Sequence, residues 1–553
     1  RDLHLSIRRQ RQMCIRDRHD VDTVFGMPGA QTYDLFDAFY EARKKIRVIL
    51  VRHEQAAAYM AFGYARSTGK VGVFCVVPGP GVLNTMAALC TAHGANQPLL
   101  CLTSEVPSDF IGKGRRHLHE LPDQLGSLRS LLKWAEQIDQ PQDVPTMVNE
   151  AFVQMQSGRP GPVSLQIPWD TLGATGEVDF LDPIEIPRVS ASRSEIRTAA
   201  ELINQSKMPM IYVGGGALHA GEEVIRLAEI IGAPVASFRS GRGVVSDDHP
   251  LTVMLPVAAE LWEETDLVVG VGSRLEGLYM RWNMMQWQER PREPKVIRID
   301  IDPKEMKYWP PDQAVVGDAK PTVETLATEL EKRGLRYENQ TERISKAKSR
   351  VCEAINTVQP QIALLEVIRE ILPRDGFITG EMTQVGFTSQ VAFPVYEPRT
   401  YVTCGHQDTL GYGFPTALGV KVANPDKVVI SITGDGGFQF AIQELATAKQ
   451  FNINLITIVF NNSAYGNVRR DQETRFGGRV IGADLVNPDF LALARAYGVQ
   501  GYQTQDADGL REALRVAVVK DEPAVIEVIL ETGSEVSPWP FILRDAFAGN
   551  TVV

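Results

Sequence analysis

The residues best suited to chemistry lie in two short runs near the C-terminal end of the chain. The run GDGG occupies residues 434–437 and the run FNNSAYG occupies residues 460–466, so Asn462 follows Asp435 by 27 residues. Strands are predicted at residues 428–432 and 455–460, with a helix at residues 438–450 between them. Both runs therefore follow strands of one βαβ unit. They should lie at the carboxyl ends of adjacent parallel strands, where open α/β sheets bind ligands.

The oxygen donors in these runs suit a hard divalent cation. Asp435 supplies a carboxylate oxygen, Asn462 an amide oxygen and the backbone of Ala464 a carbonyl oxygen. This set leaves room for phosphate oxygens and favours octahedral Mg²⁺ over Zn²⁺. Gly436 and Gly437 would let the backbone approach a diphosphate at the start of the next helix. The alternative is a capped strand-to-helix turn followed by an unrelated polar turn, but the spacing of the two runs argues against it.

A second candidate is Glu54, in the run VRHEQAAA at residues 51–58. It follows a predicted strand at residues 46–51 and opens a predicted Ala-rich helix at residues 55–66. A carboxylate at a helix start can stabilise the helix by up to about 1 kcal/mol through its interaction with the helix dipole. By itself, Glu54 is therefore either a helix-stabilising charge or a functional carboxylate.

Together these runs resemble the thiamine-diphosphate (ThDP) fingerprint of the superfamily that includes acetolactate synthase, pyruvate oxidase, benzoylformate decarboxylase and benzaldehyde lyase. The likeness covers most of residues 21–530. It implies ThDP and Mg²⁺ as cofactors, with Gly434, Tyr465 and Gly466 also at the cofactor. It further implies that Glu54 hydrogen-bonds the pyrimidine N1′ and, through shared proton transfer, promotes loss of the thiazolium C2 proton.

A third run, GHQDTLGYG at residues 405–413, resembles the segment that bends the cofactor in this family. The resemblance implies that Leu410 lies beneath the cofactor, and that the carbonyl of Asp408 and the N–H of Leu410 bind the aminopyrimidine. Asp408 departs from the family, which usually has Gly there, and Leu410 as an ordinary core residue remains an alternative. Thr383 and Gln384 fall where relatives contact the diphosphate, and Asn84 where they approach the pyrimidine. Each of these three could instead be a satisfied turn residue.

Several polar residues are expected near the substrate. The expected pocket residues are Ala30, Gln31, His93, His119, Asn467 and Asp471. Gln31 and His119 are expected to reach the reacting centre. Asp471 stands where acetolactate synthase has a Trp, Asn467 replaces an apolar residue, and His119 stands where a Gln is usual. The pocket should therefore be more polar than that of a branched-chain biosynthetic enzyme. His117 is a further candidate, although a lone His is more often a surface or hydrogen-bonded core residue.

The alternation of short β-branched runs with helical patterns predicts an α/β chain of three doubly wound domains with mainly parallel sheets. The expected domains are a pyrimidine-binding domain at residues 19–172, a central Rossmann-like domain at 188–335 and a diphosphate-binding domain at 360–553. Residues 1–18 contain six Arg without periodicity and are expected to be a non-native segment.

Composition limits the partners. The net charge of −11 argues against nucleic acid, and no apolar run approaches the length of a membrane span. Six scattered cysteines without a CxxC pair indicate reduced thiols, so a cytoplasmic location is expected. In relatives the cofactor lies between the first domain of one chain and the third domain of another. The resemblance therefore implies a homodimer or homotetramer with active sites at the dimer interface.

A flavin is not expected. Arg274, residues 300–301 (Asp-Ile) and residues 318–319 (Asp-Ala) match positions that hold FAD in flavin-containing relatives. The stretch between residues 250 and 266 is shorter than in those relatives, however, and lacks their Met-His-Gly segment.

The favoured function is ThDP- and Mg²⁺-dependent decarboxylation of a 2-oxo acid, with carboligation of the remaining enamine to a second carbonyl, as in acetolactate synthase. The first alternative is a 2-oxo acid decarboxylase or 2-hydroxyketone lyase, which uses the same residues. A flavin-dependent oxidase and a non-catalytic homologue are weaker alternatives. Joint retention of Glu54, Asp435 and Asn462 argues against the last of these.

Overall fold

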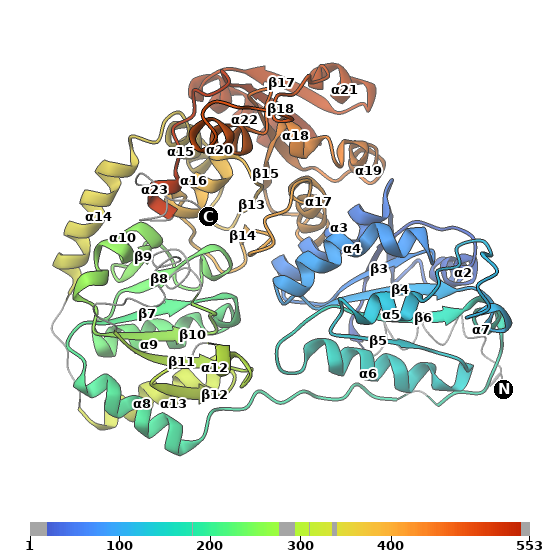
Figure 1. The fold of residues 1–553 in the computed structure, drawn as a ribbon, viewed down its shortest axis with the longest axis horizontal. Helices are drawn as coiled ribbons and strands as arrows, with labels where there is room; N and C mark the ends of the chain where they lie inside the picture. Colours follow the sequence, from blue (N-terminus) through green and yellow to red (C-terminus); the bar gives the residue numbers. More distant parts are fainter. Residues whose placement is uncertain (1–18, 180, 276–293, 309, 335–339, 543–553) are drawn as a thin grey trace.

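The computed structural model describes residues 19–179, 181–275, 294–308, 310–334 and 340–542. The expected non-native segment at residues 1–18 lies outside these ranges. The described chain forms three α/β domains, each built on a six-stranded sheet whose strands all pair in parallel (Figure 1). This architecture confirms the predicted fold class.

The first domain has the strand order β2-β1-β3-β4-β6-β5. Its strands are β1 (Thr23–Gly26), β2 (Arg47–Leu50), β3 (Gly72–Val76), β4 (Leu99–Glu105), β5 (Trp134–Gln137) and β6 (Val163–Pro168). Its helices are α2 (Tyr33–Glu41), α3 (Glu54–Thr68), α4 (Pro80–Gly94), α5 (Gln124–Arg129), α6 (Val144–Gln156) and α7 (Trp169–Gly173). Helix α3 is buried on nearly every side, which suits its Ala-rich sequence.

The central domain has the strand order β12-β11-β10-β7-β8-β9. Its strands are β7 (Pro209–Val213), β8 (Val235–Ser237), β9 (Thr252–Met254), β10 (Leu267–Val271), β11 (Lys295–Asp300) and β12 (Gln313–Val316). Its helices are α8 (Arg193–Gln205), α9 (Gly221–Ile231), α10 (Leu255–Glu260), α12 (Glu305–Tyr308) and α13 (Ala319–Lys332), and α14 (Thr341–Ile355) leads into the third domain. A capping box of Ser192 and Glu195 sets the start of α8.

The third domain has the strand order β14-β13-β15-β16-β18-β17. Its strands are β13 (Phe377–Gly380), β14 (Tyr401–Val402), β15 (Val429–Gly434), β16 (Ile456–Asn461), β17 (Gln500–Thr504) and β18 (Ala524–Ile529). Its helices are α15 (Gln361–Ile371), α16 (Gln384–Ala392), α17 (Gly413–Ala423), α18 (Asp435–Phe438), α19 (Leu445–Gln450), α20 (Gly466–Arg475), α21 (Phe490–Ala496), α22 (Ala507–Lys520) and α23 (Trp539–Ile542). None of the helices in the described ranges is both long and apolar enough to cross a bilayer.

The prediction of one continuous helix at residues 438–450 was wrong. The structure divides that segment into the end of α18, a 3-10 turn η7 (Ile442–Glu444) and α19. The backbone leaves helical geometry at Ala441, where φ is −137° and ψ is 17°. The break directs Glu444 towards the first domain, where its carboxylate accepts hydrogen bonds from the backbone N–H of Arg52 at 2.9 and 3.1 Å.

Helices α3 and α17 join the first domain to the third, and they lie side by side between the two sheets in Figure 1. Their backbones meet at two glycines. A Cβ atom at Gly63 would lie 2.0 Å from the carbonyl oxygen of Thr416, and one at Gly419 would lie 2.0 Å from that of Met60. One buried apolar cluster continues from the first domain through this crossing into the third. The crossing therefore fixes the position of Glu54, the first residue of α3, relative to the third domain.

The glycine contact predicts the effect of one added methyl group. Gly63→Ala should lower the midpoint of thermal unfolding, because backbone atoms must separate to admit it, at a cost of about 1–3 kcal/mol or more. Gly173→Ala is the matched control, since a Cβ there meets no atom of the described residues within 4 Å. Equal midpoints for the two variants would contradict the tight crossing.

Glu444 predicts a pH dependence of stability. Burial raises its pKa to about 7. The hydrogen bonds from Thr447 and from the Arg52 backbone lower the pKa but do not cancel the effect of burial. Between about pH 4.5 and 7 the folded chain therefore holds a proton that the unfolded chain has lost, so this group's contribution to stability falls as pH rises, by on the order of 3 kcal/mol. In Glu444→Gln the midpoint of thermal unfolding should fall less between pH 5 and pH 8 than in the unmodified protein. The exposed Glu512, changed to Gln, should leave the pH profile unaltered.

Candidate active site

The strand ends of the third domain bring Asp435 and Asn462 together. β15 and β16 pair in parallel with Gly434 opposite Phe460, and Asp435 and Asn462 each directly follow one of these two strands. This is the adjacency that the sequence spacing predicts. Asp435 is the first residue of α18. Ala464 is buried and forms an isolated antiparallel β-bridge with Asp484.

The carboxylate of Asp435 is buried, and hydrogen bonds offset the cost of burying its charge only in part. Its Oδ2 accepts from the side-chain amide of Asn487 at 2.7 Å, and that amide also donates to Asn461 Oδ1 at 2.8 Å. Burial raises the pKa of Asp435, and hydrogen bonds from Asn487 and from the backbone N–H groups of Gly436 and Ser463 oppose the shift only in part. A bound divalent cation would stabilise the ionised form. Asn487 is not among the residues predicted for the site.

The side chain of Asn462 is held at both ends. Its Oδ1 accepts from the backbone N–H of Ala464 at 3.1 Å, and its Nδ2 donates to Glu535 Oε2 at 2.7 Å. A Cβ at Gly466 would lie 2.7 Å from this Nδ2, so a larger residue would displace the amide.

The glycines of the GDGG run face side chains from two other segments, the loop at residues 381–383 and the turn at Tyr465. A Cβ at Gly434 would lie 3.1 Å from Thr383 Cγ2, one at Gly436 would lie 2.4 Å from the Tyr465 ring, and one at Gly437 would lie 2.3 Å from Glu381 Oε1. Thr383 caps α16 by accepting from the N–H of Gly386, which places Gln384 in the first turn of that helix. Thr383 and Tyr465 therefore lie beside this turn.

Glu381, a residue that the sequence analysis did not single out, links the turn to the loop at residues 405–412. Its carboxylate accepts from the backbone N–H of Gly411 and, at 2.5 Å, from the hydroxyl of Thr433. Burial raises the pKa of Glu381 to about 7. It follows β13 as Asp435 follows β15, and a search for polar residues at the ends of all predicted strands would have found it.

The loop also explains the Asp that departs from the family pattern. Asp408 has φ +44°, in the left-handed region that glycine favours and Asp tolerates. Its two carboxylate oxygens pair with the guanidinium of Arg239, a buried residue of the central domain, at 2.9 and 3.0 Å. Leu410 is only half-buried, so it is not an ordinary core residue in this chain.

Glu54 and Asn84 meet in the first domain. Asn84 Nδ2 donates to Glu54 Oε2 at 3.0 Å, and a Cβ at Gly81 would lie 3.7 Å from Glu54 Oε1. His53 precedes Glu54 as the cap of α3 and accepts from the N–H of Gln55.

Gln31 and His119 also come together. Gln31 Nε2 donates to the carbonyl of Leu118, the residue before His119, at 3.0 Å. Gln31 has φ +72° and His119 has φ +66°. Gln31 Oε1 and His119 Nδ1 are buried, and neither has a hydrogen-bond partner among the described residues. Ala30 lies next to Gln31 in the turn before α2.

The remaining pocket candidates do not form one group. Asn467 Oδ1 accepts from Gln384 Nε2 at 3.4 Å and from Trp539 Nε1 at 2.7 Å, which ties it to the third-domain strand ends. Asp471 pairs with its neighbour Arg470 at 2.9 Å. His93 lies near the opposite end of α4 from Asn84, about 13 Å along the helix axis. Burial, together with Arg274 and Arg159, lowers the pKa of His93.

The C-terminal segment at residues 535–539 covers the strand ends, although none of its residues was predicted for the site. Glu535 contacts Asn462, Ser537 accepts from Arg470, and Trp539 donates to Asn467. The Trp539 ring also packs on Phe387 with ring centres 4.9 Å apart. The segment carries little helical or strand pattern, and its one sequence signal is a Trp between two prolines.

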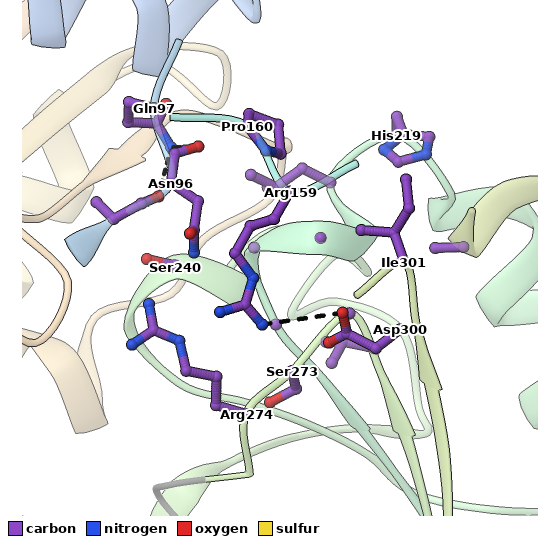
Figure 2. A pocket seen from close by; sticks show the side chains of 18 of the residues that line it. Asn96, Gln97, Arg159, Pro160, His219, Ser240, Ser273, Arg274, Asp300 and Ile301 are labelled. Carbon is purple, nitrogen blue, oxygen red and sulfur yellow. Dashed lines mark hydrogen bonds and ion pairs between the residues drawn. The ribbon is translucent and has the colours of Figure 1, made fainter. Parts of the chain in front are cut away.

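A separate pocket of about 420 Å³ lies between the central domain and the other two (Figure 2). The residues proposed above as flavin positions, Arg274, Asp300–Ile301 and Asp318–Ala319, all line it. Arg159 reaches across to Asp300, with the charged atoms 4.0 Å apart. Burial, together with Arg399, lowers the pKa of Arg66 in its wall to about 9. The pocket is thus rich in cations although the chain as a whole is acidic.

Comparison with known proteins identifies the family. Residues 14–127, 196–326 and 381–528 match the N-terminal TPP-binding, central and C-terminal TPP-binding domains of thiamine pyrophosphate enzymes. The chain is 34% identical to a probable 2-ketoarginine decarboxylase of Pseudomonas aeruginosa, over 92% of this chain and 91% of that protein. It is 32% identical to the acetolactate synthase large subunit of Haemophilus influenzae over 95% of each chain, and 33% identical to an acetolactate synthase of Arthrospira platensis over 92% of each. The chain therefore belongs to the thiamine pyrophosphate enzymes and is an acetolactate synthase-like, ThDP-dependent enzyme.

Proposed function

We propose that the protein decarboxylates a 2-oxo acid and joins the remaining acyl fragment to a second carbonyl compound, with ThDP and Mg²⁺ as cofactors. The observation that carries this proposal is that the buried Asp435 and Asn462 follow adjacent parallel strands. The chain also has Glu54 at the start of α3.

The site's chemistry fits Mg²⁺ and a diphosphate. Asp435 offers a buried carboxylate whose ionised form lacks full compensation, and Asn462 and Ala464 add neutral oxygen donors. Gln384 Oε1 is buried without a hydrogen-bond partner among the described residues, as expected of a group that binds a ligand. A cluster of three or more His, Cys, Asp or Glu side chains suited to a metal does not occur in the described ranges. The proposed ligand set has one carboxylate and does not need such a cluster.

The chain's own residues would then divide the work. Asp435, Asn462 and the Ala464 carbonyl would hold the metal, while Gly434, Gly436, Gly437, Thr383 and Gln384 would surround the diphosphate, with Tyr465 and Gly466 supporting the turn. Asp408 and Leu410 would orient the pyrimidine ring through their backbone groups. The bound cofactor supplies a carbon nucleophile and an electron sink for decarboxylation. Glu54, held by Asn84, would carry the proton that must be shared with the pyrimidine N1′.

Gln31 and His119 would act on the substrate. Their unpaired buried atoms can hydrogen-bond its carboxylate or carbonyl oxygen. Asn467 and Asp471 would line the acceptor side. His93 stays a predicted pocket residue, about 13 Å along the axis of α4 from Asn84. FAD is left out, since the residues that match flavin positions form only part of a flavin site.

We propose a homodimer or homotetramer with active sites at the dimer interface. Asn84 is exposed and Leu410 half-buried in the single chain. The apolar side chains of Leu83, Phe440 and Val468, each close in sequence to a site residue, are about half exposed. A second copy of the chain would cover such surfaces.

A simple 2-oxo acid decarboxylase is the second candidate. The relative named as a 2-ketoarginine decarboxylase and the polar residues Asn467 and Asp471 both favour it. The two reactions share the residues above and differ only in whether a proton or a second carbonyl takes up the acyl fragment.

Product analysis tests the proposal. The purified protein with ThDP, Mg²⁺ and pyruvate, or a larger 2-oxo acid, should release CO₂ and form a coupled hydroxyketone, identified by mass spectrometry and chiral chromatography. Glu54→Gln should lower turnover by about a hundredfold or more, because it removes the proton-transfer group, while ThDP binding persists. An aldehyde as sole product would select the decarboxylase. Full turnover in Glu54→Gln would refute the proposed role of Glu54.

A further inference from the structure

Glu535 lies behind one of the proposed metal ligands, in a part of the chain beyond the C-terminal TPP-binding domain match, which ends at residue 528. Its Oε2 accepts from Asn462 Nδ2 at 2.7 Å. This contact bears on metal binding because the two ends of an Asn amide differ. Only the oxygen can ligate Mg²⁺, and the NH₂ group would repel it.

A carboxylate beside the NH₂ end removes this ambiguity. Burial and the nearby Asp435 raise the pKa of Glu535, while its hydrogen bond from Asn462 lowers it. In its ionised form a Glu only accepts hydrogen bonds, so Glu535 then favours the Asn462 orientation in which Nδ2 faces it and Oδ1 faces away. At the other end, Oδ1 accepts one bond from the N–H of Ala464 at 3.1 Å, and a carbonyl oxygen has a second lone pair for a metal. The nearby Gly466 leaves the room that this arrangement requires.

The segment that carries Glu535 is anchored on both sides. The hydroxyl of Thr532 donates to the carbonyl of Asn462 at 2.7 Å. The backbone N–H of Val536 donates to the carbonyl of Gln359 at 3.1 Å, and Gln361 Nε2 donates to the carbonyl of Val536 at 2.5 Å. The position of Glu535 is therefore set by packing against α15 and β16 and does not depend on its one bond to Asn462.

We propose that Glu535 is a positioning residue for the metal site, which fixes the side-chain amide of Asn462 with its oxygen available to the cation and adds a negative charge behind that ligand. This inference rests on the proposed ThDP and Mg²⁺ site. Partners that orient metal ligands in this way typically contribute about ten- to a hundredfold in metal affinity.

A double-mutant cycle tests the role. Mn²⁺, which takes the same oxygen ligands as Mg²⁺, is titrated into protein saturated with ThDP, and free Mn²⁺ is measured by electron paramagnetic resonance. Glu535→Ala should raise the dissociation constant by about ten- to a hundredfold. In the Asn462→Asp background the ligand has two equivalent oxygens and needs no orientation. There, Glu535→Ala should leave Mn²⁺ affinity unchanged or improve it, because it removes a carboxylate beside another carboxylate.

The exposed Glu531, changed to Ala in the same segment, is the control for loss of charge and should not alter Mn²⁺ affinity. If Glu535→Ala fails to fold, Glu535→Gln takes its place, since Gln can pair with either end of the Asn462 amide and so loses the orientation. An equal loss of affinity in both backgrounds, or no loss in either, overturns the proposed role of Glu535. No Mn²⁺ binding to the unmodified protein with ThDP overturns the cofactor site itself, and the positioning role with it.

Discussion

The cost of burying the Asp435 carboxylate is the constraint on which the site depends. A charged group at the end of an interior strand is unfavourable unless something compensates it, and the hydrogen bonds from Asn487 and from the backbone of Gly436 and Ser463 do so only in part. A divalent cation is the natural compensation in a site that also presents an amide oxygen and a carbonyl oxygen. The glycines around Asp435 are forced by side chains that already occupy the space of a Cβ, so the open turn is part of the packing.

Close backbone packing also positions Glu54, the proposed activating carboxylate. Glu54 belongs to the first domain and Asp435 to the third, and the two domains meet where backbone touches backbone at Gly63 and Gly419. Glu444 strengthens this junction by accepting from the backbone just before Glu54. The central domain contributes through Arg239, which pairs with Asp408 in the loop proposed to bind the pyrimidine. Within one chain, these contacts fix where Glu54, the loop at residues 405–412 and Asp435 lie relative to one another, and in the proposed dimer the first domain of one chain would face the third domain of the other.

The local parts of this arrangement could be predicted from the sequence. Apolar β-branched runs at the right spacing predicted β15 and β16 as neighbours, and the order of strand, turn and helix placed Asp435 and Asn462 at one edge. Glu54 was found because it opens an Ala-rich helix within a recognisable family pattern. In each case the signal lies within a few tens of residues.

Contacts between distant segments could not be predicted in this way. Arg239 and Asp408, Glu444 and Arg52, and Glu535 and Asn462 come from different domains or from segments without a periodic pattern. The break at Ala441 has the same origin, because the contact of Glu444 with the first domain outweighs the local preference for a continuous helix.

The most direct test of the account measures proton exchange at C2 of bound ThDP in D₂O, with Mg²⁺ present and substrate omitted, by acid quench and NMR. This reports on Glu54 whatever the substrate is. The account predicts that the protein accelerates exchange by about a hundredfold or more over free ThDP, and that Glu54→Gln loses this acceleration while still binding the cofactor. Exchange in Glu54→Gln as fast as in the unmodified protein would contradict it.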